Sequence, residues 1–177
     1  MKKIVLGFAL AMFTSFIVTG FYLGYYKSVI FSNESNIELH LLYMEHLGPY
    51  HLINEKIESV EAWTNSNNIE CPLSFGEFFD DPEKQVPEKL NSHAGCVVDE
   101  KPSMDLPDNI KYKVLSIESA LVAKFEGSPA LGPLKVYPEA KDWFAKNKKP
   151  WDRSLEIYFL KDGNFSTKYI FPIDLDY

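Results

Sequence analysis

HLGPY at residues 46–50 and FEGSPA at residues 125–130 each end a run of strand-like residues and begin a helix-like one. In both cases a tryptophan follows fourteen residues after the proline, as Trp63 and Trp143. Proline suits the first position of a helix, where its missing N–H would have no partner, and glycine permits the sharp turn before it. The recurrence predicts that this chain of 177 residues uses one local structure twice.

The first copy has the pattern of a strand, a helix and two more strands. Apolar and polar residues alternate in IELHLLY at 37–43, which is typical of a strand with one buried face. From Tyr50 to Trp63 the apolar residues recur at three- and four-residue steps, which predicts an amphipathic helix. LSFGEFFDD at 73–81 and HAGCVVD at 93–99 then have the composition of strands, with a turn-rich segment between them.

The second copy repeats this order. KYKVLSIESALVAKF at 111–125 predicts a strand, and GSPALGPLKV at 127–136 leads into a helix that is apolar on one side. SLEIYFL at 154–160 and STKYIFPI at 166–173 predict the last two strands, which a KDGN turn joins. A polar link with several prolines separates the two copies.

One offset aligns the copies across their strands. A shift of 79 residues places Glu77 of the first copy at the position of Glu156 in the second. One copy alone cannot bury both its helix and the face of its sheet. The sequence therefore predicts an α+β fold, formed by tandem duplication of a strand–helix–strand–strand module. We expect this domain at 36–177, with its first half at 36–100 and its second half at 110–174.

The amino-terminal segment differs from the rest of the chain. Residues 4–26 form an uncharged apolar and aromatic run, with lysines on both sides, that is long enough for a membrane-spanning helix. We predict one transmembrane helix as an uncleaved anchor at 1–27, followed by a linker at 28–35. The excess of positive charge before the run favours a single-pass membrane protein whose domain is extracytoplasmic, and periplasmic in a bacterium.

The charge balance excludes some partners. All 25 acidic residues follow residue 27, whereas three of the 18 basic residues precede residue 28, which leaves the domain with a formal charge of −10. Such a domain repels phosphate groups. We therefore expect no nucleic acid partner and no binding to anionic lipid.

The sequence holds no motif for a metal or a cofactor. The four histidines do not have the spacing of a metal site, and there is no HExxH and no glycine-rich phosphate loop. We expect neither a metal nor a cofactor. Cys71 and Cys96 can form one disulfide in an oxidising compartment or remain two thiols, and the sequence does not decide between these states.

Several short motifs follow one another in a distinctive order. They are HLGPY, FFDDP followed by VPEKL and HAGCVV, KFEGSP in the second half, and LEIYFL near the end. In this order they resemble the GyrI-like small-molecule-binding domains, which also form the effector-binding half of multidrug-responsive transcription regulators. The resemblance covers about residues 36–174. It implies the tandem fold predicted above, with a ligand groove between the two halves.

The resemblance also implies a binding site. Glu156 has the position of the acidic residue that contacts cationic, aromatic ligands in the family, and Tyr158 shares its strand face because side chains alternate along a strand. The aromatic residues that can line the groove are Tyr50, Trp63, Tyr137 and Trp143. Without the family, a strand glutamate more often faces solvent, and a tryptophan on the apolar side of a helix more often packs in the core.

Two features differ from the regulators. In this sequence the predicted anchor, and not a DNA-binding helix-turn-helix, precedes the domain, so the resemblance does not carry over the regulator role. The anchor together with VYP at 136–138 is similar to the eukaryotic endoplasmic-reticulum autophagy receptor that is built on this domain.

Three functions remain open at this point. The first is a membrane-anchored module that binds a hydrophobic or aromatic ligand, a cationic one included, in the groove between the two repeats. The second is a small-molecule hydrolase in which Glu156 acts as the general base. The third is a membrane-tethered scaffold for an unknown protein partner. We expect binding rather than catalysis, because the sequence contains no recognised catalytic motif.

Overall fold

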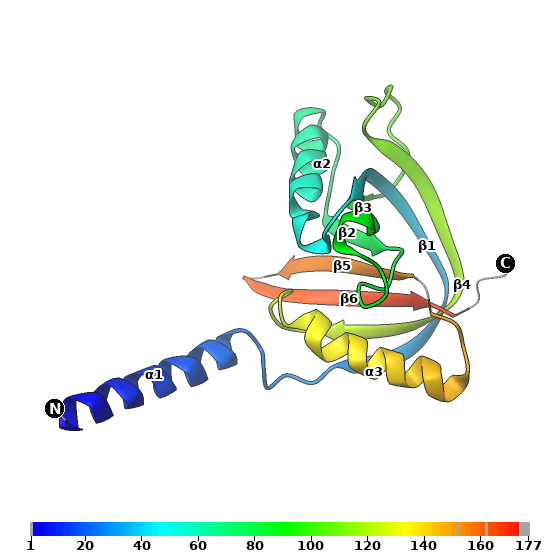
Figure 1. Cartoon of the computed structure of the whole chain (residues 1–177). Coiled ribbons are helices and arrows are strands. Elements are labelled where there is room, and N and C mark those ends of the chain that lie inside the picture. Colours follow the sequence, from blue (N-terminus) through cyan, green and yellow to red (C-terminus); the bar gives the residue numbers. More distant parts are fainter. Residues whose placement is uncertain (1, 152, 162, 174–177) are drawn as a thin grey trace.

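The computed structural model describes residues 2–151, 153–161 and 163–173 (Figure 1). Over these residues six strands form a closed antiparallel barrel in the order β1-β3-β2-β5-β6-β4. The strands are β1 (Ile30–Leu47), β2 (Leu73–Phe78), β3 (Asn91–Val98), β4 (Lys111–Phe125), β5 (Ser154–Lys161) and β6 (Asn164–Pro172). Together with the helices they form the mixed α+β fold that the sequence predicts.

Three α-helices and two short 3-10 helices occur in the described residues. They are α1 (Lys2–Tyr22), η1 (Tyr50–Leu52), α2 (Asn54–Ser66), η2 (Pro87–Lys89) and α3 (Gly132–Asn147). The order β1-α2-β2-β3, followed by β4-α3-β5-β6, is the order expected for the two halves. A common origin of the halves by duplication remains a prediction, because element order alone does not establish it.

The strand β1 begins several residues before the alternating hydrophobic pattern that predicts it. It begins at Ile30, within the segment 28–35 that the sequence predicts as a linker, and Ile30 pairs with Lys124 of β4. None of the side chains in this segment is fully buried and half of them are both polar and exposed, so no hydrophobic alternation indicates a strand. Backbone hydrogen bonds to β4 hold this part of β1, together with the partly buried side chain of Phe31 and an ion pair between Glu34 and Lys168.

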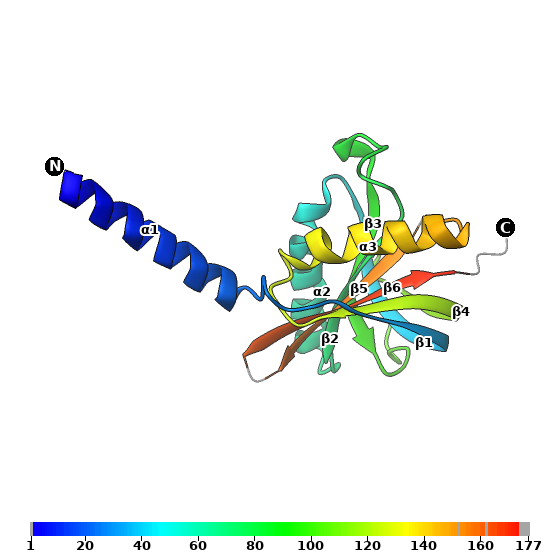
Figure 2. The ribbon, with the colours of Figure 1, turned by 90° about the horizontal axis from the view of Figure 1, so that it is seen from below.

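Side chains are buried on both faces of the barrel wall. The interior holds Phe75 of β2 and Leu155 of β5, among others. On the outside, α3 packs Val136 and Phe144 against β4 and β6, and α2 packs Val60 against β1 and β3. Figures 1 and 2 show α2 and α3 on the outer surface of the barrel. Each strand therefore has one side chain directed into the barrel and the next directed outward.

Cys71 and Cys96 form a disulfide, with their Cα atoms 5.4 Å apart. The bond joins the segment before β2 to β3, across a sequence separation of 25 residues. The closed loop contains β2, the following residues 79–90 and the start of β3. The structure thus decides between the two cysteine states that the sequence left open.

The prediction of a membrane anchor is corrected by the structure. In the part of the chain that the structure describes, no helix is both long enough and apolar enough to cross a membrane. The predicted transmembrane helix and the single-pass, extracytoplasmic location therefore do not stand.

Candidate functional site

A cavity of about 890 Å³ lies on the outer surface of the barrel, over β2 and β5. One wall comes from η1 and the first residues of α2, and the opposite wall comes from residues 129–141 at the start of α3. Residues 80–83, which follow β2, form the rim. The cavity therefore lies between the helices of the two halves, where the sequence predicts a groove.

Glu156 of β5 faces this cavity and is only 5% exposed. Its neighbours Leu155 and Ile157 point into the barrel, so alternation directs Glu156 outward. In the neighbouring strand the residue opposite Glu156 is Gly76. A Cβ atom at Gly76 would lie 2.9 Å from both Ile53 and Phe78. The absence of a side chain there lets these two apolar residues pack closely beside the carboxyl group.

Two tyrosines bind the carboxyl group of Glu156. The Tyr137 hydroxyl donates a hydrogen bond to Oε1 at 2.6 Å, and the Tyr158 hydroxyl donates one to Oε2 at 3.2 Å. The Tyr137 hydroxyl also lies 3.0 Å from the Ser154 hydroxyl. Since Tyr158 shares the strand face of Glu156 and Tyr137 comes from α3, these contacts connect the strand to the helix across the cavity floor.

Burial controls the protonation of Glu156. Loss of water around the carboxyl group raises its pKa to about 7, and the hydrogen bonds from Tyr137 and Tyr158 only partly oppose this effect. Burial also raises the pKa of both tyrosines well above the ordinary value, and the negative charge of Glu156 adds to the shift. Near neutral pH the cavity floor therefore holds both the protonated and the charged form of Glu156, beside two neutral phenols.

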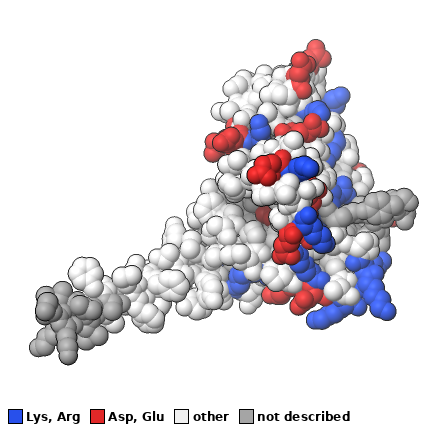
Figure 3. Space-filling model, viewed as in Figure 1, with Lys and Arg blue, Asp and Glu red and all other residues white. Residues whose placement is uncertain are grey.

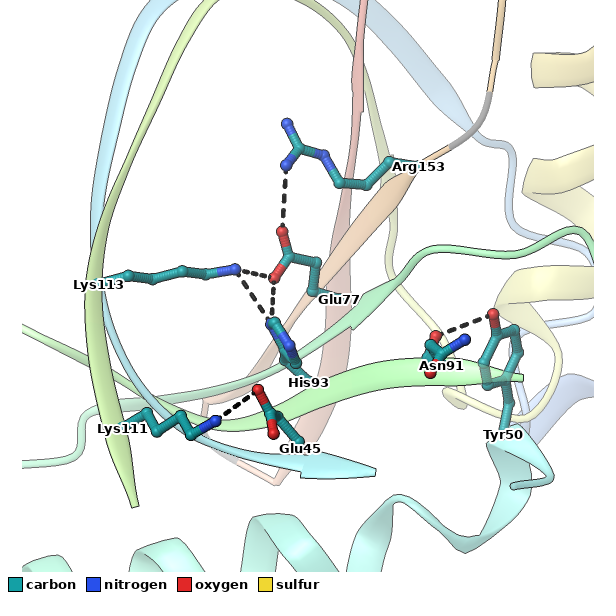
Figure 4. Close-up of polar contacts among 8 residues, drawn as sticks. All are labelled: Glu45, Tyr50, Glu77, Asn91, His93, Lys111, Lys113 and Arg153. Atoms are coloured by element: carbon teal, nitrogen blue, oxygen red, sulfur yellow. Dashed lines mark hydrogen bonds and ion pairs between the residues drawn. The ribbon is translucent and has the colours of Figure 1, made fainter. Parts of the chain in front are cut away.

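Aromatic side chains line the cavity on both sides. Trp151 stacks on Tyr137, with ring centroids 5.7 Å apart and an interplanar angle of 23°. On the opposite wall Tyr50 packs edge-on against Phe78 at 4.7 Å. The Tyr50 hydroxyl donates to the carbonyl oxygen of Asp80 at 3.0 Å. It also lies within hydrogen-bond distance of the carbonyl oxygen of Asn91 (Figure 4). Tyr50 thus connects the wall to the rim, and partial burial raises the pKa of its hydroxyl to about 12.

Four of the six residues that the sequence proposes for the site lie at the cavity, namely Tyr50, Tyr137, Glu156 and Tyr158. The other two do not. Trp63 packs against the core beneath α2, and Trp143 packs edge-on against Phe144 at 5.1 Å. Both tryptophans come late in their helices, whereas the cavity lies between the helix starts.

Sequence reasoning missed Trp151 and Arg153, which also line the cavity. Both belong to the connection between α3 and β5, where no periodic pattern indicates which way a side chain points. The tandem offset gives no help either, because it aligns strands and helices and not the connections between them.

Charged residues surround the cavity entrance. Lys141 of α3 lies 2.7 Å from Glu83 and 3.7 Å from Asp81, and its ammonium group is 5.5 Å from the centre of the Trp151 ring. Figure 3 shows acidic and basic side chains interspersed on the visible face of the barrel. Within the described residues, no group of three or more His, Cys, Asp or Glu side chains could hold a metal ion.

A second buried glutamate lies inside the barrel. Glu77 of β2 has no exposed side-chain surface and pairs with Lys113 of β4. His93 Nδ1 lies 3.1 Å from Glu77 Oε2, and Arg153 lies 3.5 Å from Oε1. Figure 4 shows these four side chains converging, three from the strands β2, β3 and β4 and Arg153 from the residue before β5. Burial alone would raise the pKa of Glu77, but hydrogen bonds from His93 and Lys113 and the nearby charges of Lys113 and Arg153 lower it overall.

The profile of the GyrI-like small-molecule-binding domain matches residues 37–174. The chain belongs to the GyrI-like family. None of the curated proteins matches this GyrI-like chain significantly. The match identifies residues 37–174 as a domain of the small-molecule-binding type.

Solved structures share the fold of this GyrI-like chain at low identity. EcmrR in complex with DNA has 12% identity and a TM-score of 0.62, over 99% of this chain and 69% of that chain. The EcmrR carboxy-terminal domain has 14% identity and a TM-score of 0.60, over 84% of this chain and 98% of that domain. A hydrolase from Listeria innocua has 10% identity and a TM-score of 0.51, over 81% of this chain and 91% of the hydrolase. At these identities the likeness establishes the fold alone, and no comparison supports the expected resemblance to the autophagy receptor.

Proposed function

We propose that this protein binds a flat aromatic molecule with a cationic or protonatable nitrogen, in the cavity between η1, α2 and α3. The observation that carries the proposal is the Glu156 carboxyl group. It is buried at the floor of an aromatic cavity, and the partners of its two oxygens are the hydroxyls of Tyr137 and Tyr158. Two phenols satisfy its hydrogen bonds but do not compensate its charge.

A cationic ligand would supply the missing charge. Ionised carboxylates are costly to bury without a counter-ion, and the raised pKa of Glu156 reflects this cost. A positive nitrogen beside Glu156 would stabilise the charged form. The faces of Tyr137 and Trp151 would pack against an aromatic body and attract its positive charge. The cavity volume is that of a site for a drug-sized molecule.

The same carboxyl group supports hydrolysis as the second candidate. A pKa of about 7 suits a general base near neutral pH. A bound water molecule would have to reach an oxygen of Glu156 in place of a tyrosine hydroxyl, because each oxygen already accepts one hydrogen bond. Binding requires no such rearrangement of the site and is the function that the geometry supports better.

Thermal unfolding of the full chain with a panel of cationic and neutral aromatic compounds tests the proposal. A compound at a hundred times its Kd should add ~2.7 kcal/mol to the free energy of unfolding, which raises the Tm by several degrees. We expect Glu156→Gln to abolish the shift with cationic compounds. Glu118→Gln is the matched control, because it removes an exposed carboxylate on β4 away from the cavity.

Each other outcome has a defined meaning. Equal Tm shifts for wild type and Glu156→Gln would refute the role of the carboxylate. Breakdown of a compound by wild type but not by Glu156→Gln would favour the hydrolase. The lack of any shift across the whole panel would favour a scaffold whose cavity binds no small molecule.

A further inference from the structure

Arg153 lies where the cavity meets the interior of the barrel. It lines the cavity together with Glu156, and it also extends to Glu77 inside the barrel (Figure 4). Its position immediately before β5 explains this double contact. Ser154 is the first strand residue and faces the cavity wall through Tyr137, so the preceding side chain points toward the opposite face.

The hydrogen bonds of Arg153 are incomplete. Its contact to Glu77 is 3.5 Å long, at the limit of a hydrogen bond. Its Nε atom is buried and has no hydrogen-bond partner among the described residues. An arginine offers five N–H donors in a rigid plane, and a buried donor without an acceptor costs stability. This guanidinium group therefore retains donors for a further acceptor.

The charges around Arg153 favour an anionic acceptor. Glu77 is already paired with Lys113, which is closer to it than Arg153 is. His93 also contacts the same Glu77 oxygen as Lys113. Inside this cluster one carboxylate therefore faces two permanent positive charges, and Arg153 is the cation whose charge is less fully compensated.

Lys141, the lysine of the same cavity, differs from Arg153 in this respect. It lies 2.7 Å from Glu83 and also close to Asp81, so acidic partners at the rim already compensate its charge. Of the two cations that line the described cavity wall, Arg153 is the one with an unmatched buried donor.

We propose that Arg153 binds a carboxylate of the cavity ligand. The ligand would then be an aromatic molecule with a basic nitrogen near Glu156 and a carboxylate near Arg153. A planar guanidinium group recognises a carboxylate with two parallel hydrogen bonds. This inference rests on the proposed function and names the ligand class more closely, as zwitterions rather than simple cations.

Fluorescence anisotropy titrations of the full chain test this inference with two probes. One is a cationic xanthene dye with a free carboxylate, and the other is the methyl ester of the same dye. We expect the free acid to bind wild type about tenfold more tightly than the ester, because only the acid has a carboxylate that can form charge-assisted hydrogen bonds with Arg153. Arg153→Gln should remove this preference, chiefly by weakening the binding of the free acid. Lys124→Gln, which removes an exposed lysine on β4, should leave both affinities unchanged.

A second variant separates the loss of the guanidinium group from a loss of the folded structure. Arg153→Lys retains a positive charge near Glu77 but lacks the planar pair of donors, so we expect a folded protein with most of the preference lost. A preference that survives in both Arg153 variants would overturn the inference, and so would a preference that disappears in Lys141→Gln instead. Binding of the ester without any preference for the acid would overturn it while the proposed function stands. If neither dye binds to wild type, both proposals fail together.

Discussion

Glu77 and Glu156, which an offset of 79 residues aligns in the sequence, lie on the neighbouring strands β2 and β5, and both are buried. The side chain of Glu77 points into the barrel and meets Lys113, His93 and Arg153. The side chain of Glu156 points outward and meets two phenols. The pKa of Glu77 is lowered, whereas the pKa of Glu156 is raised to about 7. Burial is common to both, so the partners decide the charge.

The comparison separates a structural carboxylate from one that is available to a ligand. A buried carboxylate with cationic partners contributes to the fold, because removal of either charge leaves the other unpaired. A buried carboxylate with neutral partners costs stability in its charged form and gains from an external cation. Perturbed carboxyl groups in cavities are typical of functional sites for this reason.

The largest effect is expected from Glu77→Gln. The change leaves Lys113 and Arg153 without their shared counter-ion, and we expect the free energy of unfolding to fall by about 3–4 kcal/mol at neutral pH. Urea denaturation measures this change. Glu156→Gln, which removes a carboxylate without a cationic partner, should cost less than ~1 kcal/mol or stabilise the protein. Equal losses for the two variants would contradict the distinction between them.

A somewhat smaller effect is expected in the pH dependence of stability. The pKa of Glu156 is raised in the folded state, so the folded protein binds this proton more tightly than the unfolded chain does. Its contribution to stability is complete below pH ~4.5 and is lost as the pH rises toward about 7, by about 2–3 kcal/mol.

Glu77 has the opposite sign, because its lowered pKa contributes stability that is lost as the pH falls through the folded-state value. Urea denaturation of wild type and Glu156→Gln from pH 4 to pH 8 isolates the Glu156 contribution as the difference between the two curves. We expect wild type to lose stability relative to the variant as the pH rises. A constant difference would show that the carboxyl group of Glu156 has an ordinary pKa.

The smallest effect is expected from the tyrosines that bind Glu156. Tyr137→Phe removes the hydrogen bond of 2.6 Å, so we expect the pKa of Glu156 to rise further and the protein to lose about 1 kcal/mol above pH 7. Tyr158→Phe removes the bond of 3.2 Å and should have the weaker effect. NMR titration of the Glu156 carboxyl carbon measures both shifts. A lower pKa in Tyr137→Phe would contradict the assigned direction of this hydrogen bond.

The sequence predicts the helices and strands and indicates Glu156 as a site residue. It does not predict how the side chains of Glu77 and Glu156 are oriented relative to each other. The offset of 79 residues aligned Glu77 with Glu156, and the family resemblance indicated Glu156. Neither could show that the two side chains lie on opposite faces of the barrel wall. In β2 apolar residues lie on both faces, with Phe75 inside the barrel and Phe78 outside it, so this strand lacks the alternation that distinguishes an inner face from an outer one.

Two further differences between the expectations from sequence and the structure have equally local causes. Helical periodicity placed Trp63 and Trp143 on the buried sides of their helices, but it could not show that the cavity lies at the other end of each helix. Arg153 became a candidate only when the structure placed it beside both the cavity and Glu77. Such a position depends on the register of β5 against β2, which a single sequence does not reveal.

The Cys71–Cys96 disulfide also affects what happens if the chain is cut near the cavity. Rim residues 80–83 lie within the loop that this bond closes. A protease that cuts the rim once therefore produces two polypeptides that remain covalently joined. The two walls of the cavity stay on one molecule until the disulfide is reduced, so the rim can be opened without separating Tyr50 from Glu156.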